Sequence, residues 1–314
     1  MTASAQHYST LEKYILAAVI ILVALNLRPV LASVGPLLAA IQQDIPLSFR
    51  LASLLTTLPV FAMGLFCLAG YQLAQRFGVN QIILGSLLLI LLSATMRLFA
   101  FNAISLILTA LIAGLGIALI QALIPMVIKN VYGAQHPKMM GLYITGIMAG
   151  AAMSASLSPF IEAEYGWQAG LGSWGILALL GLMAWWFYKP DSQHFESIEP
   201  TNAVIPGQWR NRRSWYLAIF FSLGSSCYVC VLAWLSPYAI EQGYTAKQAG
   251  LMLGLLTAME VVAGLVFPVL AARNIDRRRI LYLLCVLQII GFGGMALRPD
   301  ISLWLWSAIA GLGI

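Results

Sequence analysis

The chain has 314 residues, of which 61% are hydrophobic and only 9% are charged, and its formal net charge is +6. A soluble domain carries roughly 25% charged residues, so this composition excludes an ordinary water-soluble fold. Apolar runs of about 20 residues recur along the whole length and predict an all-α integral membrane protein.

The first apolar run begins near Tyr14, is longer than a signal-peptide core and is not followed by a small-residue cleavage site, so it predicts a retained first helix. Polar breaks divide the remaining sequence into further spans. The expected spans are 14–38, 50–70, 80–97, 104–128, 139–161, 169–188, 214–239, 247–271 and 279–297, with a partial tenth from about 302. No disulfides are expected, because all four cysteines fall inside these spans.

Lysine and arginine residues are distributed unevenly between the two sides of these spans. The N-terminus and alternate loops hold twelve of the 17, four lie on the other side, and Arg28 lies within a span. Because cytoplasmic loops carry the excess of basic residues, the N-terminus is expected in the cytoplasm. The positive charge is therefore interpreted as a topology signal, and no nucleic-acid partner is expected.

The longest polar stretch, KPDSQHFESIEPTNAVIPGQWRNRR, follows six spans. It predicts a cytoplasmic linker, 189–213, between an N-terminal half, 1–188, and a C-terminal half, 214–314. A shift of 197 residues aligns the halves. It places Ser48-x-Arg50-x-Ala52-x-Leu54 on Thr245-x-Lys247-x-Ala249-x-Leu251, and Ala113-Gly114-Leu115-Gly116-Ile117 on Ala310-Gly311-Leu312-Gly313-Ile314.

The repeat contains an even number of helices, so its two copies have the same orientation. Parallel six-helix repeats place a substrate site between the halves, near the middle of the membrane. The second copy stops at Ile314, where the first continues with ALIQALIPMVIK. We therefore expect about nine and a half of twelve helices, and interpret the chain as a C-terminally truncated fragment that does not transport alone.

Four segments carry a family resemblance: LNLRPVLASVGPLL, LASLLTTLPVFAMG, IQALIPMVIK and AWLSPYAIEQGYTAKQAG. They resemble the cyanate permease family of the major facilitator superfamily, whose relatives include 2-nitroimidazole exporters. The resemblance covers nearly the whole chain. It implies a twelve-helix transporter of the bacterial inner membrane that works by alternating access, with a small anion as substrate. We expect the protein to be a monomer.

The loop after the second span resembles the facilitator pattern G-x-L-A-D-R-x-G-R-R. Here GYQLAQRFGVN has Gln75 in place of the acid, whereas the counterpart LAARNIDRRR keeps an Asp. These positions are interpreted either as a conformational latch or as plain topology anchors. They are Arg76, Gly78, Arg273, Asp276, Arg277 and Arg278.

Two full charges lie deep in predicted spans, Arg28 on the first and Glu260 on the eighth. Both are about 20 Å from the same side, so contact between them is feasible. Intramembrane ionisable residues usually face a cavity or pair with each other. A guanidinium presents a planar fork of donors that suits a small anion, so Arg28 is a candidate substrate ligand, with a structural ion pair as the alternative. Glu260 is either a proton carrier or gating counter-ion, or a static partner.

Other polar residues are candidate cavity groups, or else pack or form interhelical hydrogen bonds. They are Asn26, Gln121, Tyr143, Thr145, Tyr228 and Trp234. Pro29 removes a backbone N–H beside Arg28 and is expected to distort the first helix. In GIMAGAAMSASLSP, which ends at Pro159, the spacing of Gly146 and Gly150 favours close helix packing. Arg97 is expected to extend from a helix end to the membrane interface.

No enzyme motif, metal-ligand spacing or P-loop is found, so no catalytic residue, metal, cofactor or ATP-driven transport is expected. The leading hypothesis is a secondary active transporter of a small, cyanate-like anion, with proton coupling left open. The alternatives are an exporter of nitroimidazole-like or other small drug compounds, and a non-functional truncated remnant.

Overall fold

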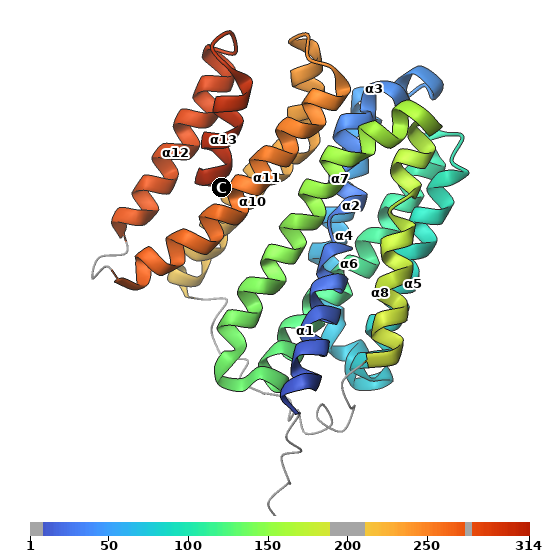
Figure 1. Ribbon diagram of the computed structural model, residues 1–314, viewed down its shortest axis with the longest axis vertical. Helices are drawn as coiled ribbons and strands as arrows, with labels where there is room; N and C mark the ends of the chain where they lie inside the picture. The colour runs from blue at the N-terminus through green and yellow to red at the C-terminus, as the bar shows by residue number, and fades with distance from the viewer. Residues whose placement is uncertain (1–8, 189–210, 274–277) are drawn as a thin grey trace, which may run out of the picture.

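The computed structural model describes residues 9–188, 211–273 and 278–314, and all regular secondary structure in these ranges is helical (Figure 1). The first bundle contains α1 (Thr10–Leu25), α2 (Pro29–Ala32), α3 (Val34–Asp44), α4 (Phe49–Phe77), α5 (Val79–Leu98), α6 (Ala103–Tyr132), the short 3-10 helix η1 (Gly133–Gln135), α7 (His136–Gly172) and α8 (Gly175–Tyr188). The second contains α10 (Arg212–Glu241), α11 (Ala246–Arg273), α12 (Arg278–Leu297) and α13 (Leu303–Gly313). Most of the expected linker lies outside the described residues.

The two bundles repeat the same helix packing. In the first, α6 packs along both α4 and α5, and in the second α13 packs along both α11 and α12. Gly114 of α6 lies directly on the backbone of Pro59 in α4, where an added Cβ would be 2.6 Å from the Pro59 Cα. Gly311 of α13 lies in the same way on the backbone of Leu256 in α11. Both pairs are related by the 197-residue shift, so the predicted repeat is present in the close packing of the backbone.

The helix starts repeat as well. Ser48 precedes α4, and its hydroxyl accepts a hydrogen bond from the Leu51 N–H at 3.3 Å. Its counterpart Thr245 precedes α11 and accepts from the Gln248 N–H, also at 3.3 Å. A side-chain oxygen at this position satisfies a backbone N–H that has no partner within the helix. The same hydroxyl chemistry therefore starts equivalent helices in both halves.

The first predicted span, 14–38, is not a continuous helix. It divides into α1, α2 and α3, with Asn26 and Arg28 at the first break. Pro29 lacks an N–H, so it cannot donate to the Leu25 carbonyl one turn earlier. That carbonyl lies against Gly150 of α7, and a Cβ on Gly150 would collide with it. The distortion expected at Pro29 is thus accommodated by a glycine on the neighbouring helix.

The fifth and sixth predicted spans also differ from the observed helices. Helix α7 continues past residue 161 to Gly172, but it contains a reversal at Gly166, whose φ of 82° lies in the left-handed region. Glycine adopts this conformation without the steric cost that a Cβ would add. Directly after it, the Trp167 indole donates to the Asp44 carboxylate at the end of α3, at 2.7 Å. This contact ties the turn to the end of α3.

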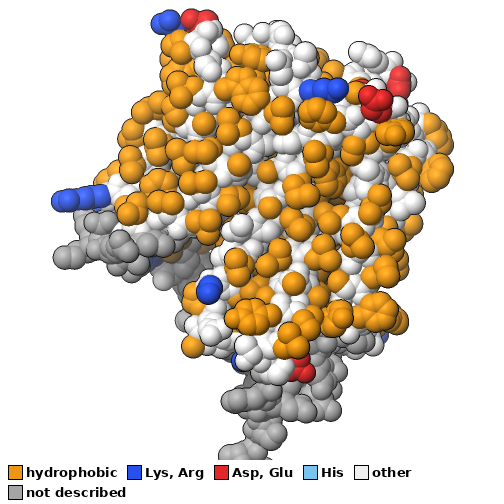
Figure 2. Space-filling view, viewed as in Figure 1, with side chains coloured by type: hydrophobic (Ala, Val, Ile, Leu, Met, Phe, Trp, Pro, Cys, Tyr) orange, Lys and Arg blue, Asp and Glu red, His pale blue; other side chains and the backbone are white. Residues whose placement is uncertain are grey.

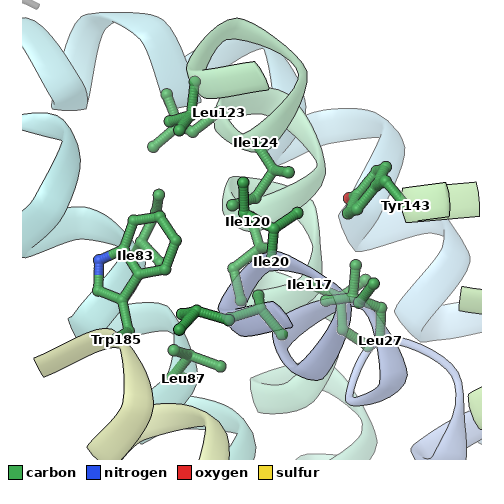
Figure 3. Packing of buried hydrophobic residues seen from close by; sticks show 14 of the residues in the cluster. Ile20, Leu27, Ile83, Leu87, Ile117, Ile120, Leu123, Ile124, Tyr143 and Trp185 are labelled. Carbon is green, nitrogen blue, oxygen red and sulfur yellow. The ribbon is translucent and has the colours of Figure 1, made fainter. Parts of the chain in front are cut away.

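Buried aliphatic side chains form the centre of the first bundle (Figure 3). Ile20 of α1, Ile83 of α5, Ile117 of α6 and Trp185 of α8 all belong to this cluster, so four helices contribute to it. All four are fully buried. Helices in lipid gain little from the hydrophobic effect when they associate, because lipid tails are as apolar as the core. Close van der Waals packing is therefore what holds these helices together.

The outer surface is apolar over the height of the molecule. On the face that Figure 2 shows, hydrophobic side chains cover the helices, and charged side chains lie toward the ends of the helices. Seven helical stretches of the described residues are long and apolar enough to cross a membrane. This surface has the character of one that contacts lipid, and the protein is an all-helical membrane protein.

Candidate functional site

The two bundles meet closely at one end of the molecule. We call this the α3 end, because α3 and α10 both finish there, and the opposite end, where α1 begins, the N-terminal end (Figure 1). At the α3 end, Gly35 of α3 lies on α10, and its added Cβ would be 3.0 Å from the Leu232 carbonyl oxygen. Gly250 and Gly254 of α11 lie in the same way on α7. Small residues therefore let the helices of the two halves approach at backbone distance.

Toward the N-terminal end, α7 and α11 border a cavity of about 580 Å³. Its lining comes from α7, α11 and α12, together with Ile314. Thr145 of α7 and Glu260 of α11 contribute its polar groups, and most other lining side chains are apolar. An open volume between two halves that touch at the other end is what a transporter needs in order to expose a site to one side of the membrane.

Arg28 lies at the boundary between the halves. It is the N-cap residue of the short helix α2, so its side chain leaves the chain where helical hydrogen bonding is interrupted. The guanidinium carbon lies over the ring of Tyr228 in α10, 5.3 Å from the ring centroid. Its Nε is buried and has no hydrogen-bond partner among the described residues. The cation is thus held by an aromatic face of the opposite half, with a donor left unused.

Three oxygen atoms near Arg28 are also buried without a hydrogen-bond partner in the described part of the chain. They belong to the hydroxyls of Tyr143 and Tyr228 and to the Glu260 carboxylate. Arg28 acts electrostatically on all three groups, and Glu260 acts on Tyr228. A buried polar atom without a partner costs free energy. A polar ligand that bridges these groups would remove that cost, which makes them a candidate site.

Arg28 and Glu260 do not form a direct ion pair. Within residues 9–188, 211–273 and 278–314, the ion pair found is Arg298 with Asp300, at 3.3 Å. Arg28 nevertheless acts electrostatically on the Glu260 carboxyl group across the boundary between the halves. The arrangement therefore leaves the guanidinium available to a small anion, with an ionisable carboxyl group close enough to respond to it.

Three of the sequence candidates lie elsewhere. Asn26 is 2% exposed, donates to the Leu22 carbonyl at 2.7 Å and lies against Gly181 of α8. Trp234 of α10 packs against Phe49, with ring centroids 6.2 Å apart, and belongs to the contacts at the α3 end. Gln121 of α6 is partly buried, and none of the hydrogen bonds among the described residues joins it to Arg28. The structure brings none of the three into the Arg28 group.

The expected latch positions are only partly described. Arg76 is exposed at the end of α4, and its guanidinium carbon lies 5.3 Å from the centroid of the Phe77 ring. Gly78 follows with a φ of 83° and connects α4 to α5. Arg278 is an exposed residue at the start of α12. Asp276, Arg277 and the side chain of Arg273 lie outside the described residues, so the latch stays a prediction.

The packing candidates all contact neighbouring helices. Gly146 lies on α1, where an added Cβ would be 3.0 Å from the Ala24 Cβ. Gly150 lies on the Leu25 carbonyl of the same helix, and Pro159 packs against Gly250 of α11. The small residues Gly146 and Gly150 of α7 therefore fit against α1, and the part of α7 around Pro159 fits against α11 of the second half.

The location predicted for one arginine from the sequence was wrong. Arg97 was expected to extend to the membrane interface, but it is 1% exposed and donates to the Val30 carbonyl at 2.9 Å. Its position in the last turn of α5 suggested exposure. The sequence carries no signal for the neighbours that bury it, because α2 and α6 reach it only in the folded chain.

Two parallel helix bundles with an apolar outer surface, a shared small-residue contact and an unpaired intramembrane arginine define a secondary transporter. Residues 15–314 match the family description Major Facilitator Superfamily. The chain belongs to this superfamily of transporters and is therefore not an enzyme. Its substrate is a small molecule, and the protein resides in a membrane.

Individual relatives agree with this assignment. The chain is 36% identical over 300 residues to the cyanate transport protein CynX of Escherichia coli (strain K12), covering 94% of this chain and 77% of that one. It is 29% identical over 303 residues to the 2-nitroimidazole transporter of the same organism, covering 96% and 77%. A bacterial homologue of the human lysosomal transporter Spinster, in an inward-facing and occupied conformation, has a similar fold, with a TM-score of 0.78 at 16% identity, over 98% of this chain and 72% of that one.

Proposed function

We propose that the protein transports a small, cyanate-like anion, which binds at Arg28 between the two halves. The observation that carries this proposal is the state of Arg28: a guanidinium at the boundary of the halves, stacked on Tyr228, with a buried Nε that lacks a hydrogen-bond partner. A planar guanidinium is suited to oxyanions and other small anions. The 36% identity to a cyanate transport protein supports the same substrate class.

The anion would bind between Arg28 and the unpartnered oxygens that surround it. The hydroxyls of Tyr143 and Tyr228 can donate to it, one from each half of the molecule. Binding groups from both halves favour the rearrangement that alternating access requires, because a bound ligand draws the halves together. Glu260 would repel the anion when ionised and accept it when protonated, which offers a route to proton coupling.

The membrane orientation follows from the distribution of basic residues. Because twelve of the 17 lie at the N-terminus and in alternate loops, the N-terminal end faces the cytoplasm under the positive-inside rule. The halves are in contact at the α3 end, whereas the cavity beside Glu260 lies toward the N-terminal end. In this orientation the described conformation is closed toward the outside.

A second substrate class is an uncharged nitroaromatic compound. The chain is 29% identical to a 2-nitroimidazole transporter, and the cavity lining is mostly apolar. The nitro oxygens could accept from Arg28 while the ring packs on apolar side chains. A cavity that selected such a ligand would tolerate loss of the positive charge better than one that selected an anion.

Binding and uptake measurements distinguish these classes. The purified full chain is titrated with cyanate, nitrite and 2-nitroimidazole, and binding is followed by the rise in thermal stability that a ligand of the folded state produces. Whole-cell uptake of labelled cyanate is measured in parallel, in short incubations because cyanate reacts with amines. We expect Arg28→Lys to weaken anion binding roughly tenfold and Arg28→Ala to abolish it, since a point charge cannot reproduce the planar fork.

The control is Arg298→Lys, which changes an exposed arginine paired with Asp300. Unaltered cyanate binding by Arg28→Ala, at equal protein abundance, would refute the anion site. Stabilisation by 2-nitroimidazole, with no effect of either anion, would establish the second class instead.

A further inference from the structure

Arg97 lies in an unusual environment for a cation. It is in the last turn of α5, yet its side chain is turned into the first bundle and is 1% exposed. No carboxylate lies at ion-pair distance from it within the described ranges, where Arg298 and Asp300 form the ion pair. An uncompensated charge inside a membrane protein is destabilising, and it is usually associated with function.

The hydrogen bonds of Arg97 join three helices. Its Nη1 donates to the Val30 carbonyl of α2 at 2.9 Å, and its Nε donates to the Thr109 hydroxyl of α6 at 3.2 Å. The Thr109 hydroxyl in turn donates to the Leu106 carbonyl, and Ser93 of α5 donates to the Thr109 carbonyl, both at 2.7 Å. The guanidinium is therefore fixed at two of its nitrogens by a network that spans α2, α5 and α6.

The helix that Arg97 contacts, α2, is the one whose N-cap residue is Arg28. Helix α2 has only four residues, and the N–H groups of Leu31 and Ala32 both donate to the Arg28 carbonyl, at 3.0 and 2.9 Å. A single helical turn does not hold its own conformation, because nucleation is unfavourable and few hydrogen bonds form. Its direction must be set by what it packs against and by the groups bonded to its backbone.

Arg28 leaves the chain at the start of this single turn, and Arg97 donates to the carbonyl of its second residue, Val30. Arg28 extends toward Tyr228 in the second half, and Arg97 holds the Val30 carbonyl from within the first half. We propose that Arg97 is a positioning residue, which fixes α2 and thereby orients the Arg28 guanidinium toward the second half. This inference rests on the proposed anion site for its functional consequence, but not for its structural one.

A lysine at position 97 would retain the charge but not the geometry. The guanidinium reaches Val30 and Thr109 with two nitrogens of one rigid group, whereas an ammonium is a single compact centre. If Arg97 acted only by its positive charge on the anion, Arg97→Lys would resemble the wild type. If it acts by position, Arg97→Lys and Arg97→Gln would both loosen α2.

The structural test is hydrogen exchange of the purified full chain without any ligand. We expect Arg97→Gln to accelerate the exchange of amides in residues 30–34 roughly tenfold, because local opening becomes easier when the carbonyl loses its charged donor. Exchange in α12 should be unchanged, and Arg298→Gln serves as the matched control at an exposed arginine. Equal exchange of residues 30–34 in wild type and Arg97→Gln would overturn the proposal.

The functional test uses anion binding. We expect Arg97→Gln and Arg97→Lys each to weaken cyanate binding roughly tenfold. In an Arg28→Lys background the same substitutions should have a much smaller effect, because the guanidinium that Arg97 positions is no longer there. Thr109→Val should give a weaker change in the same direction. Full-strength cyanate binding by Arg97→Gln would overturn the positioning role, whereas full-strength binding by Arg28→Ala would overturn the anion site itself.

Discussion

At the scale of single residues, the sequence identifies the charges but not their surroundings. Arg28 and Glu260 stand out because ionisable residues are rare in apolar spans, and the structure brings both near Tyr228. Asn26 is also polar and lies in an apolar span, but it occupies the face of the helix that packs against Gly181 in the first bundle. Which face of a helix a residue occupies depends on packing against neighbours distant in sequence. Residue type alone therefore singled out Arg28 and Glu260, but it did not show which other polar residues lie beside them.

Glu260 provides a prediction about pH. Its carboxylate would repel an anion at Arg28. The polar groups on which these charges act include Tyr143 and Tyr228, and Thr145 lines the same cavity as Glu260. Anion binding should therefore weaken as pH rises and Glu260 ionises. Glu260→Gln resembles the protonated form, so we expect it to keep tight binding and to lose most of the pH dependence. Titrations of cyanate binding from pH 5 to 9 check this, and an unchanged pH profile in Glu260→Gln would contradict it.

At the scale of helices, hydropathy located the spans well, whereas the breaks required the structure. The expected first span, 14–38, is divided into three helices, and Pro29, which removes one backbone donor, lies directly after the first break. The spacing of Gly146 and Gly150 indicated a close helix contact, and that contact is with the divided first helix. Neither proline nor glycine spacing identifies the partner helix, so the fit between them could not be predicted from sequence.

Two glycines of α7 allow a matched test of this fit. An added Cβ at Gly150 would collide with the Leu25 carbonyl, whereas at Gly141 it would meet nothing within 4 Å. We expect Gly150→Ala to destabilise the protein by about 1–3 kcal/mol, as overpacking does. Gly141→Ala should be neutral or stabilising by about 0.5–1 kcal/mol, because alanine is the better helix former. Thermal unfolding in detergent measures both, and equal melting temperatures would contradict the expectation.

At the scale of the whole molecule, the 197-residue repeat predicted two parallel bundles, and the packing of Gly114 and Gly311 on equivalent backbones confirms it. The repeat in the sequence predicted that the helices are arranged alike within each half. It did not determine how the halves lie against each other, because contacts between them involve residues such as Gly35 and Gly254 that have no matching signal in the other copy. The chain spans 77% of the length of the cyanate transport protein it resembles.

The contact between halves at the α3 end should be sensitive to size. At Gly254 of α11 a Cβ would collide with the Ser156 hydroxyl of α7, whereas at Gly264 of the same helix it would meet nothing within 4 Å. We expect Gly254→Val to separate the halves at the α3 end, and Gly264→Val to leave them together. Spin labels at the exposed residues Glu164 and Gln242, in a cysteine-free background, report the separation. Identical distance distributions for the two variants would argue against a closed contact at Gly254.

The candidate site holds one fixed cation, Arg28, and one titratable carboxyl group, Glu260. Together they determine how transport would depend on the membrane voltage. With Glu260 ionised, the empty site has no net charge, since Arg28 balances it. With Glu260 protonated and a monovalent anion bound, the site is again neutral. The site could then be exposed to either side of the membrane, in both forms, without net charge crossing the membrane. Moving one charge across the membrane would otherwise contribute about 2.3 kcal/mol per 100 mV of membrane potential. Cyanate uptake into proteoliposomes should therefore follow the proton gradient and remain insensitive to a potassium diffusion potential. In Glu260→Gln, whose site would carry a positive charge when empty, uptake should become dependent on voltage.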